Sequence, residues 1–423
     1  MKILVVGGGG REHALIKKIK ENKNVTQIYA LPGNGGIAAD AVCVPIGAKD
    51  LDGICTFAKQ EAIDYAVVAP DDPLVLGCVD RLEAEGIPCF GPNAAAAILE
   101  GSKIFAKNLM KKYGIPTARY EVFDRAEAAL AYLETAPMPT VIKADGLALG
   151  KGVIIAQTRA EARQAVTEMM ENKKFGRSGE QIVIEEFLTG PEVSVLSFTD
   201  GKTVVPMISS MDHKRAGDGD TGLNTGGMGT IAPNPYYTEE VAEQCMKTIF
   251  QPTIQAMREE GRPFKGCLYF GLMLTPDGPK LIEYNCRFGD PETQVVLPLL
   301  ESDLLEIMQA VTQERLAEMT VRFRTGAACC VVMASKGYPE SYETGYPITI
   351  PPELGACVYV AGARQQEGQL VTGGGRVLGV TAVGSDLADA VQKAYERVGQ
   401  IHFENAFYRK DIGQRALAAA KEN

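Results

Sequence analysis

The sequence predicts a multidomain protein that combines α/β and α+β architecture, with a parallel-sheet, Rossmann-like domain at its N-terminus. A length of 423 residues is enough for two to four domains with buried cores. The first hundred residues alternate short apolar segments with helical segments, as the βαβ units of parallel sheets do. Further along the chain, strands and helices are grouped in blocks, which is typical of α+β domains.

In the N-terminal part, strands are predicted from apolar runs that end in turn residues. "KILVVG" is followed by a glycine turn and a helix, and "YAVVAP" and "IPCFGP" repeat the pattern of a buried strand that ends at Pro or Gly. The expected strands are 2–7, 25–31, 65–70 and 87–92, with helices at about 11–21 and 75–86.

The rest of the chain divides into three α+β stretches. A basic amphipathic helix at 100–113 ends at "GIP", and a compact segment follows from about 119 to 190, which we expect to act as a lid hinged near Ala118 and Pro191. The lid elements are strands 140–146, 152–157 and 181–188 and a helix at 159–172; then come strands 192–201 and 279–285, a helix from about 291, strands within 326–335 and 357–384, and a helix at 386–399. The predicted domains are 1–101, 102–325 and 326–423.

Composition restricts the class of protein. A formal net charge of −10 argues against broad nucleic-acid binding. No apolar run has membrane-spanning length, and the run that opens the sequence is too short for a signal peptide. The ten cysteines are scattered without a C-x-x-C pair, so we expect reduced thiols and a cytoplasmic enzyme that binds small molecules, not membranes or nucleic acid.

The glycine run at Gly7–Gly10 follows a strand and opens a helix, where bare backbone N–H groups suit a phosphate. A tight structural turn is the alternative. A dinucleotide site is disfavoured, because Glu12 or His13 takes the third glycine position of G-x-G-x-x-G and "PGNGG" (32–36) supplies no acidic ribose ligand. We therefore expect a substrate that carries phosphate, not a nicotinamide cofactor.

The stretch "IEYNCRFGDPETQ" (282–294) carries the sharpest chemical pattern. In a strand, Glu283, Asn285 and Arg287 lie on one face at two-residue spacing. A carboxylate beside an amide oxygen suits Mg²⁺, and an arginine nearby stabilises a phosphoryl group in transfer. The alternative is an edge strand that exposes a polar face to solvent.

Lysines and glutamates extend this phosphate chemistry. Lys143 lies in the apolar strand "TVIKADG", where an unpaired ammonium is costly to bury, and the glycine-containing loop at 147–153 follows it. Lys103 could reach the same point, unless it lies on a solvated helix face. The acids in "VIEEFLTGPE" suit an adenine slot with carboxylates for ribose hydroxyls, or they are surface acids.

The segment "GDGDTGLNTGGMG" (217–229) follows "MDHKR" (211–215) and contains an unusual density of glycine. Such a cluster indicates a close approach of backbone to another group, or a flexible surface loop.

Together these stretches make the chain resemble the phosphoribosylamine–glycine ligase family of ATP-grasp enzymes. The strings "GGGGREHAL", "PGNGG", "EGSK", "VIKADGLALGKGV", "NTGGMG", "NCRFGDPETQVVLPLL" and "YRKDIG" carry the resemblance over nearly the whole chain. It implies an ATP-grasp domain with a small lid, and ligation of glycine to 5-phosphoribosylamine with ATP through glycyl phosphate. Another carboxylate–amine ligase, or a non-catalytic protein that binds a phosphometabolite, is the alternative function.

The resemblance also implies roles for individual residues. Metal binding of Mg²⁺ or Mn²⁺ falls to Glu283 and Asn285, and catalysis to Arg287, Lys143 and Lys214. The implied ATP contacts are Lys103, Lys143, Glu185, Glu186, Leu188 and Glu192. The implied substrate contacts are Gly9, Gly10, Asn34, Asp212, Lys214, Asn224, Thr225, Gly226, Gly227, Asp290 and Glu292.

The chain departs from the family pattern at "APDDPL" (69–74), where the family has a glutamate and this chain offers Asp71 or Asp72. The role of Arg376 in "TGGGRV" stays open between a hairpin contact and a nucleotide contact.

Overall fold

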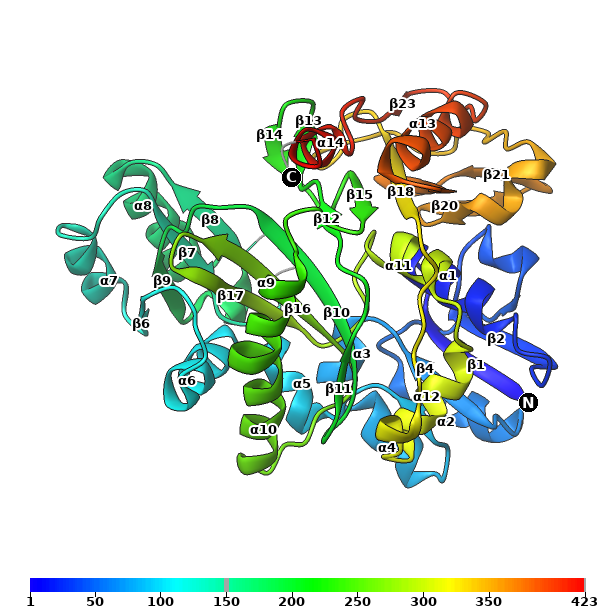
Figure 1. Cartoon of the computed structure of the whole chain (residues 1–423), viewed down its shortest axis with the longest axis horizontal. Helices are drawn as coiled ribbons and strands as arrows, with labels where there is room; N and C mark the ends of the chain where they lie inside the picture. Colours follow the sequence, from blue (N-terminus) through cyan, green and yellow to red (C-terminus); the bar gives the residue numbers. More distant parts are fainter. Residues whose placement is uncertain (148–151, 422–423) are drawn as a thin grey trace.

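The computed structural model describes residues 1–147 and 152–421. Most of the glycine-containing loop predicted at 147–153 therefore lies outside the described residues. Figure 1 shows the N-terminal part on the right, a small sheet around β7 and β9 on the left, and the C-terminal part at the top. A central sheet around β10 and β16 lies between them.

The N-terminal part is built on a five-stranded sheet in the order β3-β2-β1-β4-β5, in which every neighbouring pair is parallel. The predicted parallel sheet is confirmed. Its elements are β1 (Lys2–Gly7), α1 (Gly10–Ile19), β2 (Gln27–Pro32), η1 (Ile37–Ala39), β3 (Val42–Cys43), α2 (Leu51–Gln60), β4 (Tyr65–Val68), α3 (Asp71–Val75), α4 (Cys78–Ala84), β5 (Cys89–Phe90) and α5 (Ala94–Gly101).

The helix predicted at 100–113 is divided at Ser102, which ends α5 and begins α6 (Lys103–Tyr113). Ser102 has extended dihedral angles, and its hydroxyl accepts the N–H of Phe105 at 3.0 Å, so it is the N-cap of the second helix. The break leaves Glu100 at the end of one helix and Lys103 at the start of the next. Gly114, in the left-handed region at φ +67°, ends α6.

The stretch predicted as a lid folds on its own four-stranded antiparallel sheet, in the order β6-β9-β7-β8. A separate apolar core, with Ile142, Ile184 and Met169 at its centre, holds its helices against that sheet. Its elements are β6 (Tyr120–Phe123), α7 (Ala126–Leu133), β7 (Thr140–Ala144), β8 (Val153–Ala156), α8 (Arg159–Val166), the π-helix η2 (Thr167–Glu171), η3 (Gly176–Gly179) and β9 (Ile182–Glu186).

The central sheet has the order β11-β10-β16-β17. A bulge opposite Gly271 and Leu272 leaves Ile282 without a partner in the β16–β17 ladder. The elements are β10 (Glu192–Asp200), β11 (Val204–Pro206), α9 (Glu239–Cys245), the π-helix η4 (Met246–Phe250), α10 (Gln251–Glu259), β16 (Lys265–Thr275), β17 (Gly278–Asn285), α11 (Thr293–Leu299), α12 (Leu304–Thr312) and η5 (Leu316–Glu318).

The C-terminal sheet includes strands from the middle of the chain. Its order is β12-β15-β18-β22-β19, with β23 beside β18. β12 (Met211–Asp212) pairs with β15 (Gly229–Ala232), and β15 pairs with β18 across the domain limit predicted at 325 and 326. Between them, β13 (Arg215–Gly217) and β14 (Thr221–Asn224) form a separate hairpin. The other elements are β18 (Ala327–Ser335), η6 (Pro352–Cys357), β19 (Val358–Val360), β20 (Ala363–Gln366), β21 (Gln369–Thr372), β22 (Arg376–Gly384), α13 (Leu387–Val398), β23 (Ala406–Phe407) and α14 (Gln414–Ala419).

Candidate active site

A cavity of about 750 Å³ opens where the lid sheet, the central sheet and the β13–β14 hairpin meet. The sequence-predicted residues converge on it from segments far apart in the chain. Those on its wall are Lys103, Lys143, Glu185, Glu186, Leu188, Glu192, Asp212, Lys214, Asn224, Thr225, Gly226, Glu283, Asn285, Arg287, Asp290 and Glu292. Gly9, Gly10, Asn34 and Gly227 are not on this wall.

A buried Lys–Glu–Lys triad forms one side of the cavity. Glu185 forms an ion pair with Lys143 Nζ at 3.1 Å through one carboxylate oxygen and with Lys107 Nζ at 3.1 Å through the other. All three side chains are at most 5% exposed. Burial lowers the pKa of Lys107 to about 8, although the charge of Glu185 opposes the shift. The triad carries one net positive charge, which suits a phosphate beside it.

Glu283 lies on β17 among several cations. Partial burial raises the pKa of Glu283, but Lys214, Lys143 and Lys103 outweigh it and hold that pKa below its usual value. Among the described residues, each cation has another partner: Lys214 pairs with Glu192, Lys143 with Glu185, and Lys103 donates to the carbonyl of Gly146 at 2.8 Å. The Glu283 carboxylate is therefore ionised and available to an added cation.

Asn285 continues this face as the last residue of β17, and Arg287 follows in the bend beyond it, so the strand ends two residues earlier than the pattern predicts. Arg287 donates to Asn285 Oδ1 at 3.2 Å and pairs with Glu100 at 2.9 Å. Glu100 also accepts the N–H of Cys286 at 2.7 Å, so it holds the arginine and the backbone of the turn together. The buried Nε atom of Arg287 has no hydrogen-bond partner among the described atoms, so it has a donor left for an added ligand.

The donor set at Glu283 and Asn285 fits a hard divalent cation. A carboxylate and an amide oxygen on one strand face are ligands that Mg²⁺ accepts, with phosphate and water oxygens completing its shell. Within residues 1–147 and 152–421 no cluster of three or more His, Cys, Asp or Glu side chains has metal-binding geometry. Glu283 and Asn285 offer two side-chain oxygens to a metal that would bring phosphate ligands of its own.

An apolar slot lies between the lid sheet and the central sheet. Val141 and Ile155 line it from the lid, Met273 from β16, and Leu188 from the segment after β9. Glu186, although it lines the cavity, is held by Arg119, which donates to it from its backbone at 2.9 Å and from Nε at 2.8 Å.

Glu192, whose side chain is 50% exposed, is the least buried of the three predicted acids at this end of the cavity. It pairs with Lys214 at 3.3 Å, and the other two acids are already held by basic side chains of their own. Of the three, Glu192 is therefore the carboxylate most open to an added ligand.

The opposite end of the cavity gathers acids and arginines. Burial and the charge of Glu292 raise the pKa of Asp212, and burial also raises the pKa of Glu292. Arg376 donates to the carbonyl of Asp290 at 2.9 Å and lines the cavity. Asp71 is on the cavity wall, whereas Asp72 pairs with Lys49 at 3.6 Å outside it. Of the two aspartates that depart from the family pattern, only Asp71 faces the site.

The glycines of "NTGGMG" allow a close backbone approach. A β-carbon on Gly226 would lie 2.9 Å from the Arg376 guanidinium carbon, and one on Gly227, at φ +123°, would lie 2.5 Å from Pro291 Cδ. Thr225 closes the turn, since its hydroxyl donates to the carbonyl of Lys214 at 2.8 Å and accepts the N–H of Gly227. The segment is therefore ordered in the structure, not a free surface loop.

The glycine-run residues away from the cavity have partners of their own. The N–H of Gly9 donates to Glu12 at 2.6 Å, and Asp290 lies at the N-terminus of α1, where it accepts the N–H of Arg11 at 3.1 Å. Carboxylates thus occupy the helix end near Gly10 that was expected to receive a phosphate. A substrate contact at this run stays a prediction.

Asn34 joins two domains. Its amide donates to the carbonyls of Gly8 and Val360, and its oxygen accepts the N–H groups of Gly36 and Ile37. These four bonds use the hydrogen-bonding capacity of the side chain. A substrate could bind this side chain only by replacing one of them.

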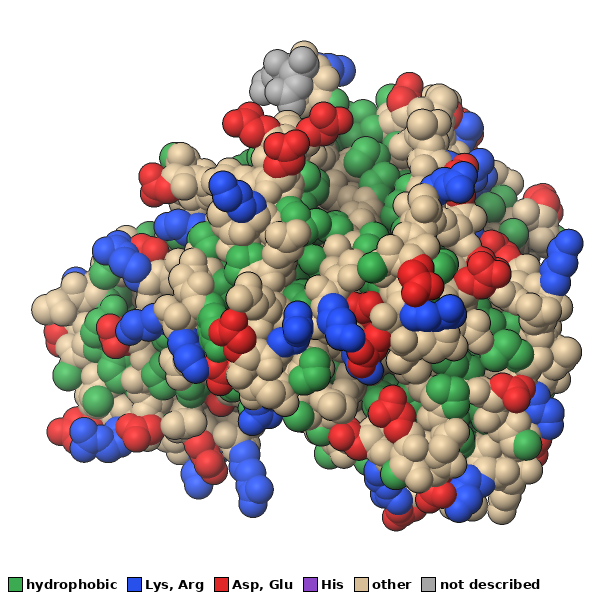
Figure 2. All heavy atoms as spheres, turned by 60° about the horizontal axis from the view of Figure 1, so that its bottom comes forward, with side chains coloured by type: hydrophobic (Ala, Val, Ile, Leu, Met, Phe, Trp, Pro, Cys, Tyr) green, Lys and Arg blue, Asp and Glu red, His purple; other side chains and the backbone are tan. Residues whose placement is uncertain are grey.

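Figure 2 shows a face on which basic and acidic side chains are interspersed. Among the helices of the described residues, none combines the length and apolar character needed to cross a membrane.

Comparison with known proteins connects this geometry to one family. The phosphoribosylglycinamide synthetase N domain matches residues 1–100, the ATP-grasp (A) domain matches 101–293, and the C domain matches 328–415. The phosphoribosylamine–glycine ligase of Allochromatium vinosum is 48% identical over 424 residues and covers 99% of each chain. The chain belongs to the phosphoribosylglycinamide synthetase family.

A further relative and a solved structure of the same family match nearly the whole chain. The phosphoribosylamine–glycine ligase of Rhizobium meliloti is 50% identical over 420 residues, with 99% of each chain covered. A crystal structure of phosphoribosylamine–glycine ligase from Thermotoga maritima has 35% identity and a TM-score of 0.84, and it covers 97% of this chain and 100% of its own. The family resemblance and the predicted ATP-grasp fold are confirmed.

Several wall residues of this synthetase-family site were not predicted from the sequence. Lys107 had a usable signal, because it lies four residues after Lys103 on the same helix face. Glu100, Tyr269 and Arg415 gave no comparable signal, since their places depend on contacts between distant segments.

Proposed function

We propose that this chain joins glycine to 5-phosphoribosylamine and hydrolyses ATP to ADP and phosphate, giving glycinamide ribonucleotide. One observation carries the proposal: an apolar slot, a lysine cluster, an available carboxylate and a mixed acid–arginine pocket share one cavity. These are the elements that a nucleotide, a phosphoryl transfer and a phosphorylated sugar amine require. Membership of the family supports the same assignment.

The nucleotide end follows from the distribution of charge. Adenine fits the apolar slot near Leu188, and the exposed carboxylate of Glu192 is available to ribose hydroxyls. Lys103 and Lys143 face the phosphates, and Glu185 serves to hold Lys143 and Lys107 rather than to bind ribose. This division of labour differs from the role that the resemblance alone implies for Glu185.

Mg²⁺ or Mn²⁺ would be held by Glu283 and Asn285, and when bound it would supply charge neutralisation to the phosphates. The residues of the chain do the remaining work. Lys143 and Arg287 orient the γ-phosphoryl group and spread its negative charge during transfer to the glycine carboxylate. The glycine carboxylate oxygen attacks phosphorus, and the bond from phosphorus to the ADP oxygen breaks.

The second step uses the opposite end of the cavity. The neutral amine of phosphoribosylamine attacks the carbonyl carbon of glycyl phosphate, and phosphate leaves. Asp212 and Glu292 have raised pKa values because they are buried together, so this pair is suited to accept the proton that the amine loses. Lys214 and Arg376 lie beside them as partners for anionic groups.

An ADP-release assay tests the function directly. Purified protein is given ATP, Mg²⁺, glycine and freshly prepared phosphoribosylamine, and each component is then omitted in turn. Product formation and ADP release should require all four. Equal turnover when other amines replace phosphoribosylamine would assign a different carboxylate–amine ligase, and no ADP under any condition would indicate a binding protein.

Oxygen-18 distinguishes the intermediate. With both carboxylate oxygens of glycine labelled, a route through glycyl phosphate transfers one label to inorganic phosphate and leaves one in the amide. Label in AMP would instead require an adenylate.

We also propose a cytoplasmic location, which the ten unpaired cysteines support because thiols persist in reducing compartments.

A further inference from the structure

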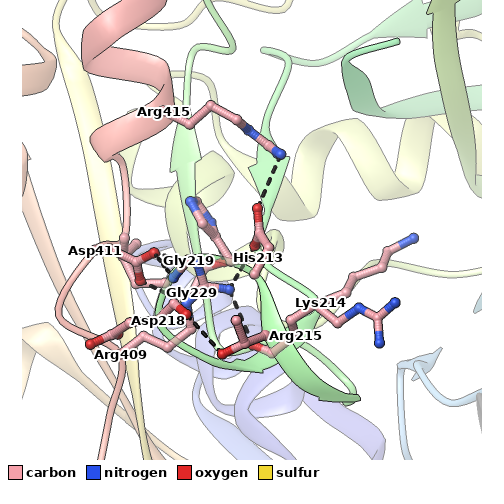
Figure 3. Close-up of polar contacts among 12 residues, drawn as sticks. His213, Lys214, Arg215, Asp218, Gly219, Gly229, Arg409, Asp411 and Arg415 are labelled. Carbon is pink, nitrogen blue, oxygen red and sulfur yellow. Dashed lines mark hydrogen bonds and ion pairs between the residues drawn. The ribbon is translucent and has the colours of Figure 1, made fainter. Parts of the chain in front are cut away.

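The C-terminal segment 408–413 lies against the β13–β14 hairpin, which we term the glycine hairpin and define as residues 215–224. Figure 3 shows polar side chains from both segments directed toward one another. The segment lies about 190 residues after the hairpin in the chain, so the contact joins the ATP-grasp part to the C-terminal part. The proposed reaction does not explain this contact, and neither does the string "YRKDIG" taken alone.

Arg409 is the centre of this contact. Its side chain is 2% exposed, and Asp411 binds it through both carboxylate oxygens, at 2.8 and 2.7 Å. Its Nη1 atom reaches the hairpin, where it pairs with Asp220 at 2.9 Å and donates to the carbonyl of Arg215 at 3.1 Å. A two-oxygen pair fixes the plane of a guanidinium, so Asp411 directs Arg409 at the hairpin.

Backbone contacts reinforce the attachment. The N–H of Lys410 donates to Asp218 at 2.8 Å, and the N–H of Gly219 donates to Asp411 at 2.9 Å. At the base of the hairpin, His213 accepts the N–H of Gly413 at 3.2 Å. The C-terminal segment thus holds both the tip and the base.

Within residues 1–147 and 152–421, the two strands of the hairpin pair only with each other. All four residues of β14 are exposed, with Leu223 at 51%. An isolated two-stranded hairpin is marginally stable in water. Yet Arg215 and Asn224 lie on the cavity wall, and Lys214 precedes them. Their positions therefore depend on the attachment to the C-terminal segment.

We propose that Arg409 is a positioning residue that fastens the glycine hairpin over the substrate end of the cavity. The inference rests on the proposed function, because it concerns the same reaction. A fastened hairpin keeps water from glycyl phosphate until the amine attacks. When it is loose, water attacks the acyl carbon, the bond from that carbon to the phosphate oxygen breaks, and glycine and phosphate return without product.

The measurable consequence is the ratio of product formed to ADP released. In Arg409→Met that ratio should fall by a factor on the order of ten, less than the roughly hundredfold that a 1 Å misplacement of reacting groups can cost. Asp220→Asn should lower it similarly, and Asn suits the left-handed backbone there, at φ +55°. Because Asp220 also lines the cavity and pairs with Arg415 at 3.3 Å, the double variant is decisive.

If Asp220 acts through Arg409, the double variant has the same ratio as Arg409→Met alone. Effects that multiply independently would overturn the proposal by assigning Asp220 a direct contact with substrate. If Arg409→Met fails to fold, the ratio is measured in Asp411→Asn instead. The Asp411 side chain is 27% exposed, so its replacement is easier for the fold to tolerate, and it does not line the cavity. An unchanged ratio in the folded variants would also overturn it. Asp277→Asn, in the exposed turn between β16 and β17, is the matched control and should equal the wild type.

Hydrogen exchange separates this proposal from the proposed function. Amides of 215–224 should exchange on the order of tenfold faster in Arg409→Met or Asp411→Asn than in the wild type. That measurement needs no substrate. Unchanged exchange refutes the attachment, whereas faster exchange in a protein without ligase activity would retain the attachment and reject the proposed function.

Discussion

His213 should stay neutral down to a pH near 4, although it lies beside the active site. Its Nδ1 atom hydrogen-bonds the carbonyl of Gly229 at 3.0 Å, and its Nε2 atom accepts the N–H of Gly413 at 3.2 Å. Only the neutral ring with its proton on Nδ1 satisfies both contacts. Burial lowers the pKa of His213 to about 4, and the charges of Arg409 and Arg415 act in the same direction while Asp220 opposes them.

This shift gives stability a defined pH dependence. Between pH 6.5 and 4 the unfolded chain binds a proton at this histidine and the folded chain does not, so stability falls as the pH falls through that window. From the two pKa values, lowering the pH from 7 to 5 removes about 2 kcal/mol through this group alone. The loss acts where the C-terminal segment holds the hairpin, because a protonated Nε2 would face the N–H of Gly413.

The assay is a pH titration by NMR of protein labelled at the histidine rings. The chain has three histidines, so the signal of His213 is the one that disappears in His213→Gln. That signal should show no titration above pH 5. The protection factor of the Gly413 amide, which is its exchange rate corrected for the intrinsic rate at each pH, should fall between pH 7 and 5. A midpoint near 6.5 with an intact fold would refute the reasoning, because the ring would then bind a proton without cost.

Three further predictions concern the nucleotide end of the cavity. Glu283→Gln should lower turnover more than about a hundredfold at saturating Mg²⁺ while the fold persists, because one preorganised charge contributes on that scale. Near-normal turnover of this variant would contradict metal binding at Glu283, and Asp277→Asn is the control. Lys107→Met should raise the KM for ATP on the order of tenfold because Glu185 loses one partner, whereas Lys107→Arg should raise it less; equal KM values would contradict the triad's role. An ATP analogue should slow hydrogen exchange across 140–190, and absence of added protection would reject the lid.

The spacing of apolar residues and the turn residues predicted those strands and helices whose signals lie within a few neighbouring residues. The strand at 2–7, the alternation that gives a parallel sheet, and the face shared by Glu283 and Asn285 follow from periodicity of two and from turn residues. The helix at 100–113 was predicted as one element because its apolar spacing continues through Ser102. The capping serine there, followed by Lys103, was the available signal for the break.

Pairing between distant segments was not predictable by the same means. The strand Gly229–Ala232 joins the C-terminal sheet through β18, about a hundred residues later, and no spacing rule connects the two. One of the two carboxylates at the N-terminus of α1 is Asp290, about 280 residues further along the chain, and the local sequence "GGGG" carries no information about it. Such contacts depend on the packing of whole domains, which residue spacing does not encode.

Residue type thus predicts membership of a site better than it predicts a role within it. Glu185 and Glu186 are adjacent acids on one strand, but alternation sends the first to Lys107 and Lys143 and the second to Arg119. Lys103 differs from the other cations in another way, since its partner is a backbone carbonyl and burial lowers its pKa. Of the lysines at this end, Lys103 therefore gains most from an incoming phosphate, because the new charge replaces a weak partner instead of competing with a carboxylate.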